Sequence, residues 1–189
     1  MMAHPTHHID VSSVLRGTVC DLYSNLVTRP TGAAVRTAIE QQVAEIGAPA
    51  VTTIDFSQVM LLDFSCADEI VAKLLLRYAH PDGPDGYVLF RGIHEGHLDP
   101  VEAVLERHAL ALVAWYDGHA ELFGAVTDEE RLVWEQVRDA GPMNSAELAH
   151  ALGMPLSDID VLVQQLCGRR VLMRQATRVL IPGDTPGMH

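Results

Sequence analysis

The sequence predicts an α/β protein with a second, mainly helical domain. Across residues 13–125, short apolar runs of strand length alternate with segments whose apolar residues recur at helical spacing. This pattern is typical of a sheet with helices packed on one side. After Thr127 the pattern changes to three helices and a short strand pair. We therefore expect an α/β domain at 13–125, a small domain at 126–183, a flexible arm at 1–12 and a tail at 184–189.

The α/β domain is expected to begin with strands and an amphipathic helix. Residues 14–26 can form one or two strands, and Pro30 suits the first turn of a following helix. Ala33–Ile46 carries apolar residues along one face, as in a helix that packs on a sheet. Gly47-Ala48-Pro49 ends that helix, and Val51–Asp55 has the composition of a buried strand.

A further helix is predicted to open at Ser65. The Ser65 hydroxyl can cap the helix, and Asp68 three residues later suits a capping box. The predicted helix has one apolar face, formed by Ala67, Ile70, Val71, Leu74 and Leu75. The pattern therefore places a serine hydroxyl at the positive end of a helix, near the edge of the sheet.

The rest of the α/β domain again alternates strands and helices. Pro81–Gly86 is predicted to be an exposed loop, and Tyr87–Gly92 a strand. Pro100–His108 has the pattern of a short helix. Leu110–Tyr116 is expected to be a strand that pairs with Ala120–Phe123 in a hairpin.

The second domain is predicted from helix-start signals and helical spacing. Thr127-Asp-Glu-Glu130 has the pattern of a capping box and opens a helix that runs to Ala140. Two further helices and the strands of a small hairpin are expected at 145–153, 155–167, 171–173 and 178–181.

The motif around the predicted helix start resembles that of STAS domains in anti-sigma-factor antagonists. In that family a strand ending in Asp-Leu is followed, after an apolar stretch, by Asp-Ser-Ser-Gly at a helix start. Here Asp55-Phe56 matches the strand end and Asp63-Phe-Ser-Cys66 lies at the helix start, with phenylalanine and cysteine in place of the first serine and the glycine. The run Ser65-Cys-Ala-Asp-Glu69 is similar to a divergent STAS-like group with Ser-Phe-Ala-Asp-Glu.

The resemblance implies a STAS-like sheet domain over residues 13–125 and a role in signalling or transcription control. The family's second motif serine accepts phosphate from a partner kinase, and it falls on Ser65. The implied partner is an anti-sigma-type kinase or a related regulator that docks near Asp63, Ser65 and Asp68. A phosphate there would lie beside acidic side chains, so we expect phosphorylation to release the partner.

The order of three helices and a hairpin is that of a winged helix, and Ser145–Ile159 resembles the second and third helices of winged helix-turn-helix regulators. This resemblance implies an alternative function as a DNA-binding transcriptional regulator. The third helix, however, carries Asp158 and Asp160 where phosphates would be met. We therefore favour protein contact, possible homodimerisation included. The basic residues that could contact DNA cluster near the hairpin: Arg169, Arg170, Arg174 and Arg178.

Composition favours a soluble cytoplasmic protein that contacts other proteins. The net charge of −12 disfavours nucleic-acid binding. The three cysteines, Cys20, Cys66 and Cys167, are scattered and are expected to be reduced thiols. No signal peptide is recognisable, and the longest apolar run, Ala109–Tyr116, is too short to cross a membrane.

Enzymatic, metal and cofactor signals are weak in this sequence. His94-Glu-Gly-His97 lacks the i, i+4 spacing of a helical zinc motif, and further histidines lie in the predicted arm. Cys66 at the helix start is expected to be a structural thiol. Glycine-rich phosphate loops, nucleophile elbows and paired catalytic carboxylates are not found. The sequence therefore predicts a non-enzymatic regulatory protein without a metal or cofactor.

Overall fold

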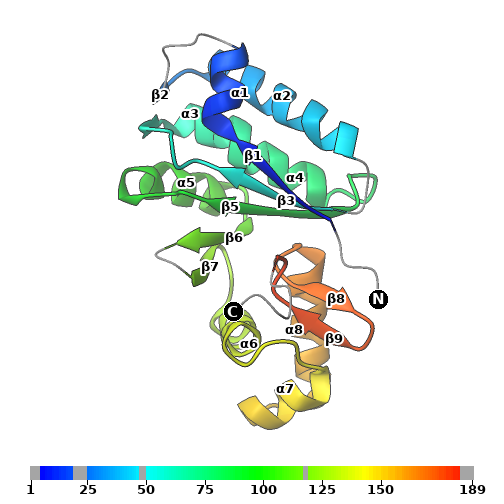
Figure 1. Ribbon diagram of the computed structural model, residues 1–189. Coiled ribbons are helices and arrows are strands. Elements are labelled where there is room, and N and C mark those ends of the chain that lie inside the picture. Colours follow the sequence, from blue (N-terminus) through cyan, green and yellow to red (C-terminus); the bar gives the residue numbers. More distant parts are fainter. Residues whose placement is uncertain (1–4, 19–24, 47–49, 117–118, 184–189) are drawn as a thin grey trace. The chain divides into compact units, whose positions relative to one another are not determined.

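Alternating strands and helices build a mixed sheet in the first part of the chain, and a helical unit follows. The computed structural model describes residues 5–18, 25–46, 50–116 and 119–183. By its internal contacts the chain divides into two units, Met1–Ala125 and Val126–His189 (Figure 1). This division coincides with the junction expected at residues 125–126.

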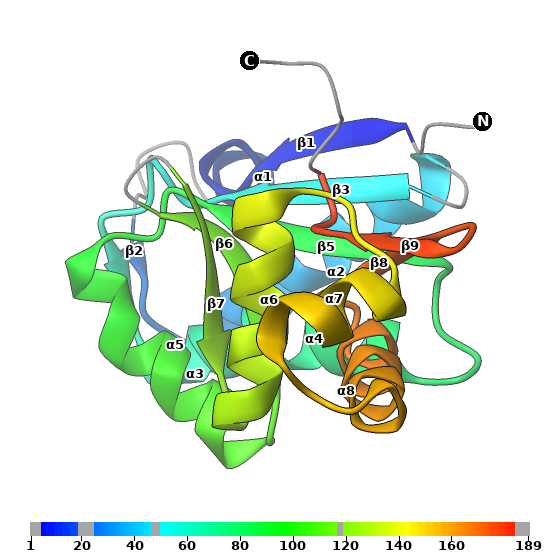
Figure 2. The ribbon, with the colours of Figure 1, turned by 90° about the horizontal axis from the view of Figure 1, so that it is seen from below.

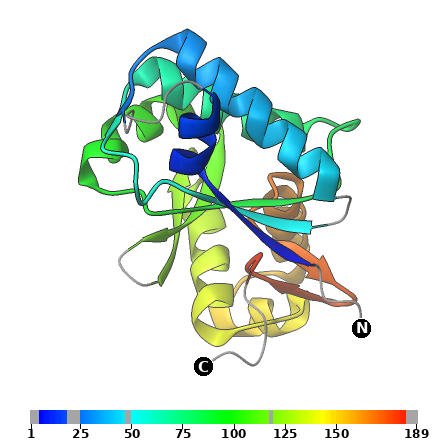
Figure 3. The ribbon, with the colours of Figure 1, turned by 45° about the horizontal axis from the view of Figure 1, so that its top comes forward.

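Within the described residues, five strands of the first unit form one sheet in the order β1-β3-β5-β6-β7. The first four are parallel and the last is antiparallel to its neighbour. Along the chain each new parallel strand is added on the same side of the previous one. Right-handed crossovers in this order put the connecting helices on one face of the sheet, as Figure 3 shows for the blue to green helices. The predicted α/β class is confirmed. The strands are β1 (Thr6–Asp10), β3 (Ala50–Asp55), β5 (Gly86–Arg91), β6 (Ala111–Tyr116) and β7 (His119–Gly124).

The helices of the first unit bury an apolar core against this sheet. The predicted apolar face of the helix near Ser65 is confirmed, since its five residues are at most 8% exposed. A second, short parallel pair joins β2 (Asn25–Leu26) and β4 (Leu61–Leu62). The helices are α1 (Val11–Thr18), α2 (Arg29–Ile46), α3 (Phe64–Ala67), the π-helical turn η1 (Asp68–Ala72), α4 (Lys73–Ala79) and α5 (Glu95–Arg107).

The N-terminal prediction was wrong for the residues that the structure describes. Residues 6–10, expected in a flexible arm, pair with β3 as an edge strand, with Thr6 opposite Val51. Residues 11–18, most of which were expected as strand, are helical. The Asp10 carboxylate accepts from the Ser12 amide at 2.9 Å, which stabilises the helix start. Residues 1–4 and 19–24 lie outside the described part.

Two other helices begin earlier than predicted. Helix α2 starts at Arg29, so Pro30 is its second residue. Helix α5 starts at Glu95 because His94 caps it, accepting from the Gly96 amide at 3.1 Å. Pro100, expected at the helix start, lies inside the helix and gives up one backbone hydrogen bond.

The second unit has the predicted order of three helices and a hairpin (Figure 2). The capping box is confirmed: the Thr127 hydroxyl accepts from the Glu130 amide at 3.1 Å, and the Glu130 carboxylate accepts from the Thr127 amide at 2.8 Å. The indole of Trp134 donates to the Val171 carbonyl at 3.0 Å in the core of this unit. The elements are α6 (Asp128–Ala140), α7 (Ser145–Leu152), α8 (Leu156–Gly168), β8 (Met173–Gln175) and β9 (Arg178–Leu180).

In the described part of the chain, no helix combines the length and apolar character needed to cross a membrane.

Candidate functional site

The helix start that carries the sequence motif is capped by Asp63, which corrects the prediction for Ser65. The Asp63 side chain accepts from the Cys66 amide at 2.8 Å, and the Asp63 backbone is extended. Ser65 lies inside the first turn, and its hydroxyl donates to Asp63 at 2.8 Å. Burial alone would raise the pKa of the Asp63 carboxyl, but these hydrogen bonds lower it overall.

Because Asp63 is the cap, a substitution at Asp63 should destabilise the protein more than one at Ser65. Asp63→Ala is expected to lower the free energy of unfolding by about 0.5–2 kcal/mol, because the helix loses its cap acceptor. Ser65→Ala removes only one hydroxyl donor and should cost less. Urea unfolding of both variants measures the difference, with Asp63→Asn as the control that keeps an acceptor. A larger loss for Ser65→Ala than for Asp63→Ala would contradict this assignment.

Behind the helix start, two buried carboxylates anchor the helix to its neighbours. Asp68 accepts from Arg29 at 2.8 Å and from His108 at 2.7 Å. Glu69 accepts from Arg29 at 2.7 Å and also pairs with Lys73. Burial opposes ionisation of both carboxyls, yet these cations lower the pKa of each. Both residues are at most 6% exposed. Asp68 was predicted to contact a partner, but its carboxylate is buried in ion pairs within the protein.

Close backbone packing holds α2 against the same helix start. A Cβ added at Gly32 would lie 2.9 Å from the Cα of Cys66, so the two helices approach closely there. The Cys66 thiol donates to the Thr28 carbonyl at 3.1 Å. Burial, and then the negative charge of Asp63, raise the pKa of Cys66 to about 12. The thiol is therefore protonated at neutral pH, as expected for a structural cysteine.

Four exposed apolar side chains lie in or next to β2, β4 and the first turn of α3, and we name them the α3 patch: Val27, Met60, Leu61 and Phe64. Their exposed fractions are 42%, 68%, 55% and 37%. The β2–β4 pairing brings the segments that carry them side by side, since Leu26 lies opposite Leu62 and the Leu26 carbonyl accepts from the Asp63 amide at 2.8 Å. This patch was not predicted from the sequence, although Met60 and Leu61 form an apolar run immediately before the motif.

A basic side chain borders the patch. The Arg107 guanidinium lies over the Phe64 ring, 5.7 Å from its centroid, in a cation–π contact. The surface thus combines apolar groups with one cation, beside the Ser65 hydroxyl. An apolar cluster with a charged border is typical of a protein-binding surface.

The four arginines near the hairpin do not form one basic surface. Arg169 pairs with Glu130 at 3.6 Å, and Arg178 pairs with Glu147 at 2.8 Å. Arg174 lies opposite Val179 while Arg178 lies opposite Gln175, so the two arginines point to opposite faces of the hairpin. Arg170 has an irregular, positive-φ backbone after α8.

The third helix presents acidic rather than basic side chains. Asp158 and Asp160 are exposed on α8, where a recognition helix would meet phosphates. The arrangement of charge in the second unit therefore gives little support to DNA binding.

The carboxyl end of β3 holds another polar cluster, which was not predicted from the sequence. Asp55 accepts from His8 at 2.8 Å and pairs with Arg91 at 3.2 Å, and it also accepts from the Ser57 amide at 2.8 Å. The carboxylate lies between the serine and the histidine, so the histidine does not contact the serine as a base. Across the described residues, no three His, Cys, Asp or Glu side chains gather as metal ligands would.

A comparison with models of protein families gives no match to this chain, and a search of curated proteins also gives none. The resemblances to STAS domains and to winged helices therefore remain predictions from the sequence.

Proposed function

We propose that this chain is a non-enzymatic regulatory protein that binds a protein partner through the α3 patch. The observation that carries the proposal is the set of exposed apolar side chains on the segments that adjoin the half-buried Ser65. The motif resemblance supplies the kind of partner, an anti-sigma-type kinase or a related regulator. Ser65 is the proposed phosphorylation site.

The surroundings of the patch support this use. Exposed Phe, Met and Leu side chains supply apolar area for an interface, and Arg107 supplies a polar border. The patch lies on a helix start fixed by the Asp63 cap and by the buried pairs of Asp68 and Glu69. A pre-organised surface loses little conformational entropy on binding.

Phosphorylation of Ser65 would act by charge. The hydroxyl donates to Asp63, and a phosphate adds about −1.5 to −2 charges and removes that donor. Repulsion from the Asp63 carboxylate would push the phosphate outward, into the apolar surroundings of Phe64. The modified form should therefore bind its partner more weakly.

Single substitutions test the proposal in the full chain. A partner is recovered with the parent protein, and the affinities of variants for that purified partner are then measured. Leu61→Asp should weaken binding at least tenfold, because it places a charge in the patch. Ser65→Asp should also weaken binding, whereas Ser65→Ala should not.

Leu76→Asp is the matched control, since Leu76 is 40% exposed on α4 and lies outside the patch. It should bind the partner as the parent does. Equal affinities of Leu61→Asp and the parent would refute the proposal. The alternative function, DNA-binding regulation, would be favoured if the parent bound duplex DNA at physiological salt and the Arg174→Glu variant did not.

A further inference from the structure

A cavity of about 220 Å³ lies at the amino ends of two neighbouring strands of the first unit. Its walls come from the second half of α2, the start of β3, the end of α4 and the turn before β5. Tyr78 in this cavity follows Ser65 by thirteen residues on one continuous helix, about 20 Å along its axis. The cavity is thus a separate site from the α3 patch.

The inner wall of the cavity is apolar and contains one pair of hydroxyl groups. Val43, Ala50 and Leu74 provide aliphatic surface. The side chains of Tyr78 and Thr52 interact with each other, and the two residues are 4% and 1% exposed. Burial raises the pKa of Tyr78, so the phenol is neutral at physiological pH. The wall therefore offers hydroxyl groups, without charge, to a ligand.

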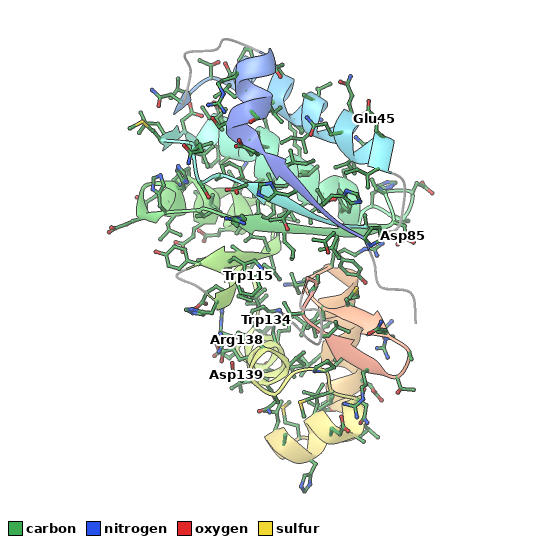
Figure 4. All side chains as sticks on the ribbon, viewed as in Figure 1. Glu45, Asp85, Trp115, Trp134, Arg138 and Asp139 are labelled. Carbon is green, nitrogen blue, oxygen red and sulfur yellow. The ribbon has the colours of Figure 1, made fainter. Side chains whose placement is uncertain are left out.

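The mouth of the cavity offers no excess of positive charge to an anion. Glu40 pairs with Arg77 at 2.8 Å and with Arg36 at 2.9 Å, so Glu40 is already balanced by cations. Asp85 is a second carboxylate at the rim. It lies at the same end of the unit as Glu45 near the end of α2 (Figure 4). The two carboxylates match the two arginines in number, so a ligand anion would meet no net positive charge at the mouth.

The volume sets the size of the ligand. An apolar cavity of about 150 Å³ binds benzene, so about 220 Å³ accommodates two fused rings. Ala44 lines the cavity and is exposed, which leaves an entrance beside α2. From these observations we infer that this cavity binds a small neutral molecule of bicyclic size, with one hydroxyl or carbonyl group bonded to the Tyr78–Thr52 pair. The inference is independent of the function proposed above.

Calorimetric titration of the full chain with 2-naphthol tests this inference. The parent should bind one molecule of 2-naphthol saturably. Naphthalene-2-sulfonate, which has the same rings and a negative charge, should bind at least tenfold more weakly. Tyr78→Phe should weaken 2-naphthol binding roughly threefold to tenfold, the effect of one neutral hydrogen bond.

Ala44→Phe fills the entrance from an exposed helix position and should weaken binding at least tenfold. Ala103→Phe on the exposed side of α5 is the matched control and should bind as the parent does. Circular dichroism verifies that each variant is folded. Absence of saturable 2-naphthol binding to the parent, or parent-like binding by Ala44→Phe, would overturn the inference. Equal binding of the sulfonate would overturn the assignment to neutral ligands.

Discussion

Trp134→Ala is expected to lower the free energy of unfolding of the second unit by about 3–5 kcal/mol. The Trp134 side chain is fully buried, and it is among the largest fully buried side chains of the protein. Its removal leaves a cavity and also leaves the Val171 carbonyl without the indole donor, which lies 3.0 Å away. Figure 4 shows Trp134 on α6, the first helix of this unit.

Hydrogen exchange of the full chain measures this effect helix by helix. Amides in α6 and α8 should lose protection in Trp134→Ala, because their shared core is weakened. Leu132→Ala on the same helix is the control, since Leu132 is 51% exposed, and it should change stability by less than about 0.5 kcal/mol. Similar protection in Trp134→Ala and Leu132→Ala would show that Trp134 does not hold this core together.

Structural features that depend on residues close together in the chain were predicted well from the sequence. The Thr127 box could be found because its two hydrogen bonds join residues three apart, within one turn of the chain. The apolar face from Ala67 to Leu75 could be found because helical spacing is independent of the partner it packs on. Both depend only on neighbouring residues.

The choice between Asp63 and Ser65 as the cap could not be made locally. Both residue types cap helices well, and they are two positions apart. The Asp63 amide donates to the Leu26 carbonyl, a contact across 37 positions that accompanies the extended backbone of Asp63. The helix therefore starts directly after Asp63, at Phe64, one residue before the predicted start at Ser65. Residue types alone did not reveal this pairing.

Edge strand β1 was missed for a similar reason. Its residues are mostly polar, with Ile9 as its buried apolar side chain, so the apolar pattern of a strand is absent. Backbone hydrogen bonds to β3, about 45 positions away, make it a strand. Pairings over such distances leave little trace in a local pattern.

The sequence also did not show which residues of the candidate site are exposed and which are buried. Leu61 and Leu62 are adjacent leucines, but Leu61 is 55% exposed and Leu62 is 6% exposed, because neighbouring strand residues face opposite sides. Conversely, Asp68 and Glu69 are buried although charged residues are usually exposed. Their burial depends on Arg29, about 40 positions earlier in the chain.

The free energy of unfolding should fall by about 3 kcal/mol as the pH decreases from 6.5 to 4, through His97 alone. His97 is fully buried, and neither ring nitrogen has a hydrogen-bond partner among the described residues. Its ring stacks on His94, with centroids 3.6 Å apart, and contacts Phe56 edge to face. Burial, and then the nearby His94, lower the pKa of His97 from 6.5 to about 4.

The sign follows from the two protonation states. Below pH 6.5 the unfolded chain binds a proton on His97, whereas the folded protein does not bind it until the pH approaches 4. The unfolded state is therefore favoured progressively across this window, and the full contribution of the neutral imidazole to stability is present only above pH 6.5.

The variant His97→Phe keeps a ring in the same space but removes the titrating group, so the stability of this variant should change much less across the window. The buried carboxylates, whose pKa values are lowered, lose their contributions at still lower pH and affect both proteins alike. Urea unfolding at half-unit pH steps gives the difference between parent and variant, and parallel curves for the two proteins would rule out a buried neutral histidine at this position.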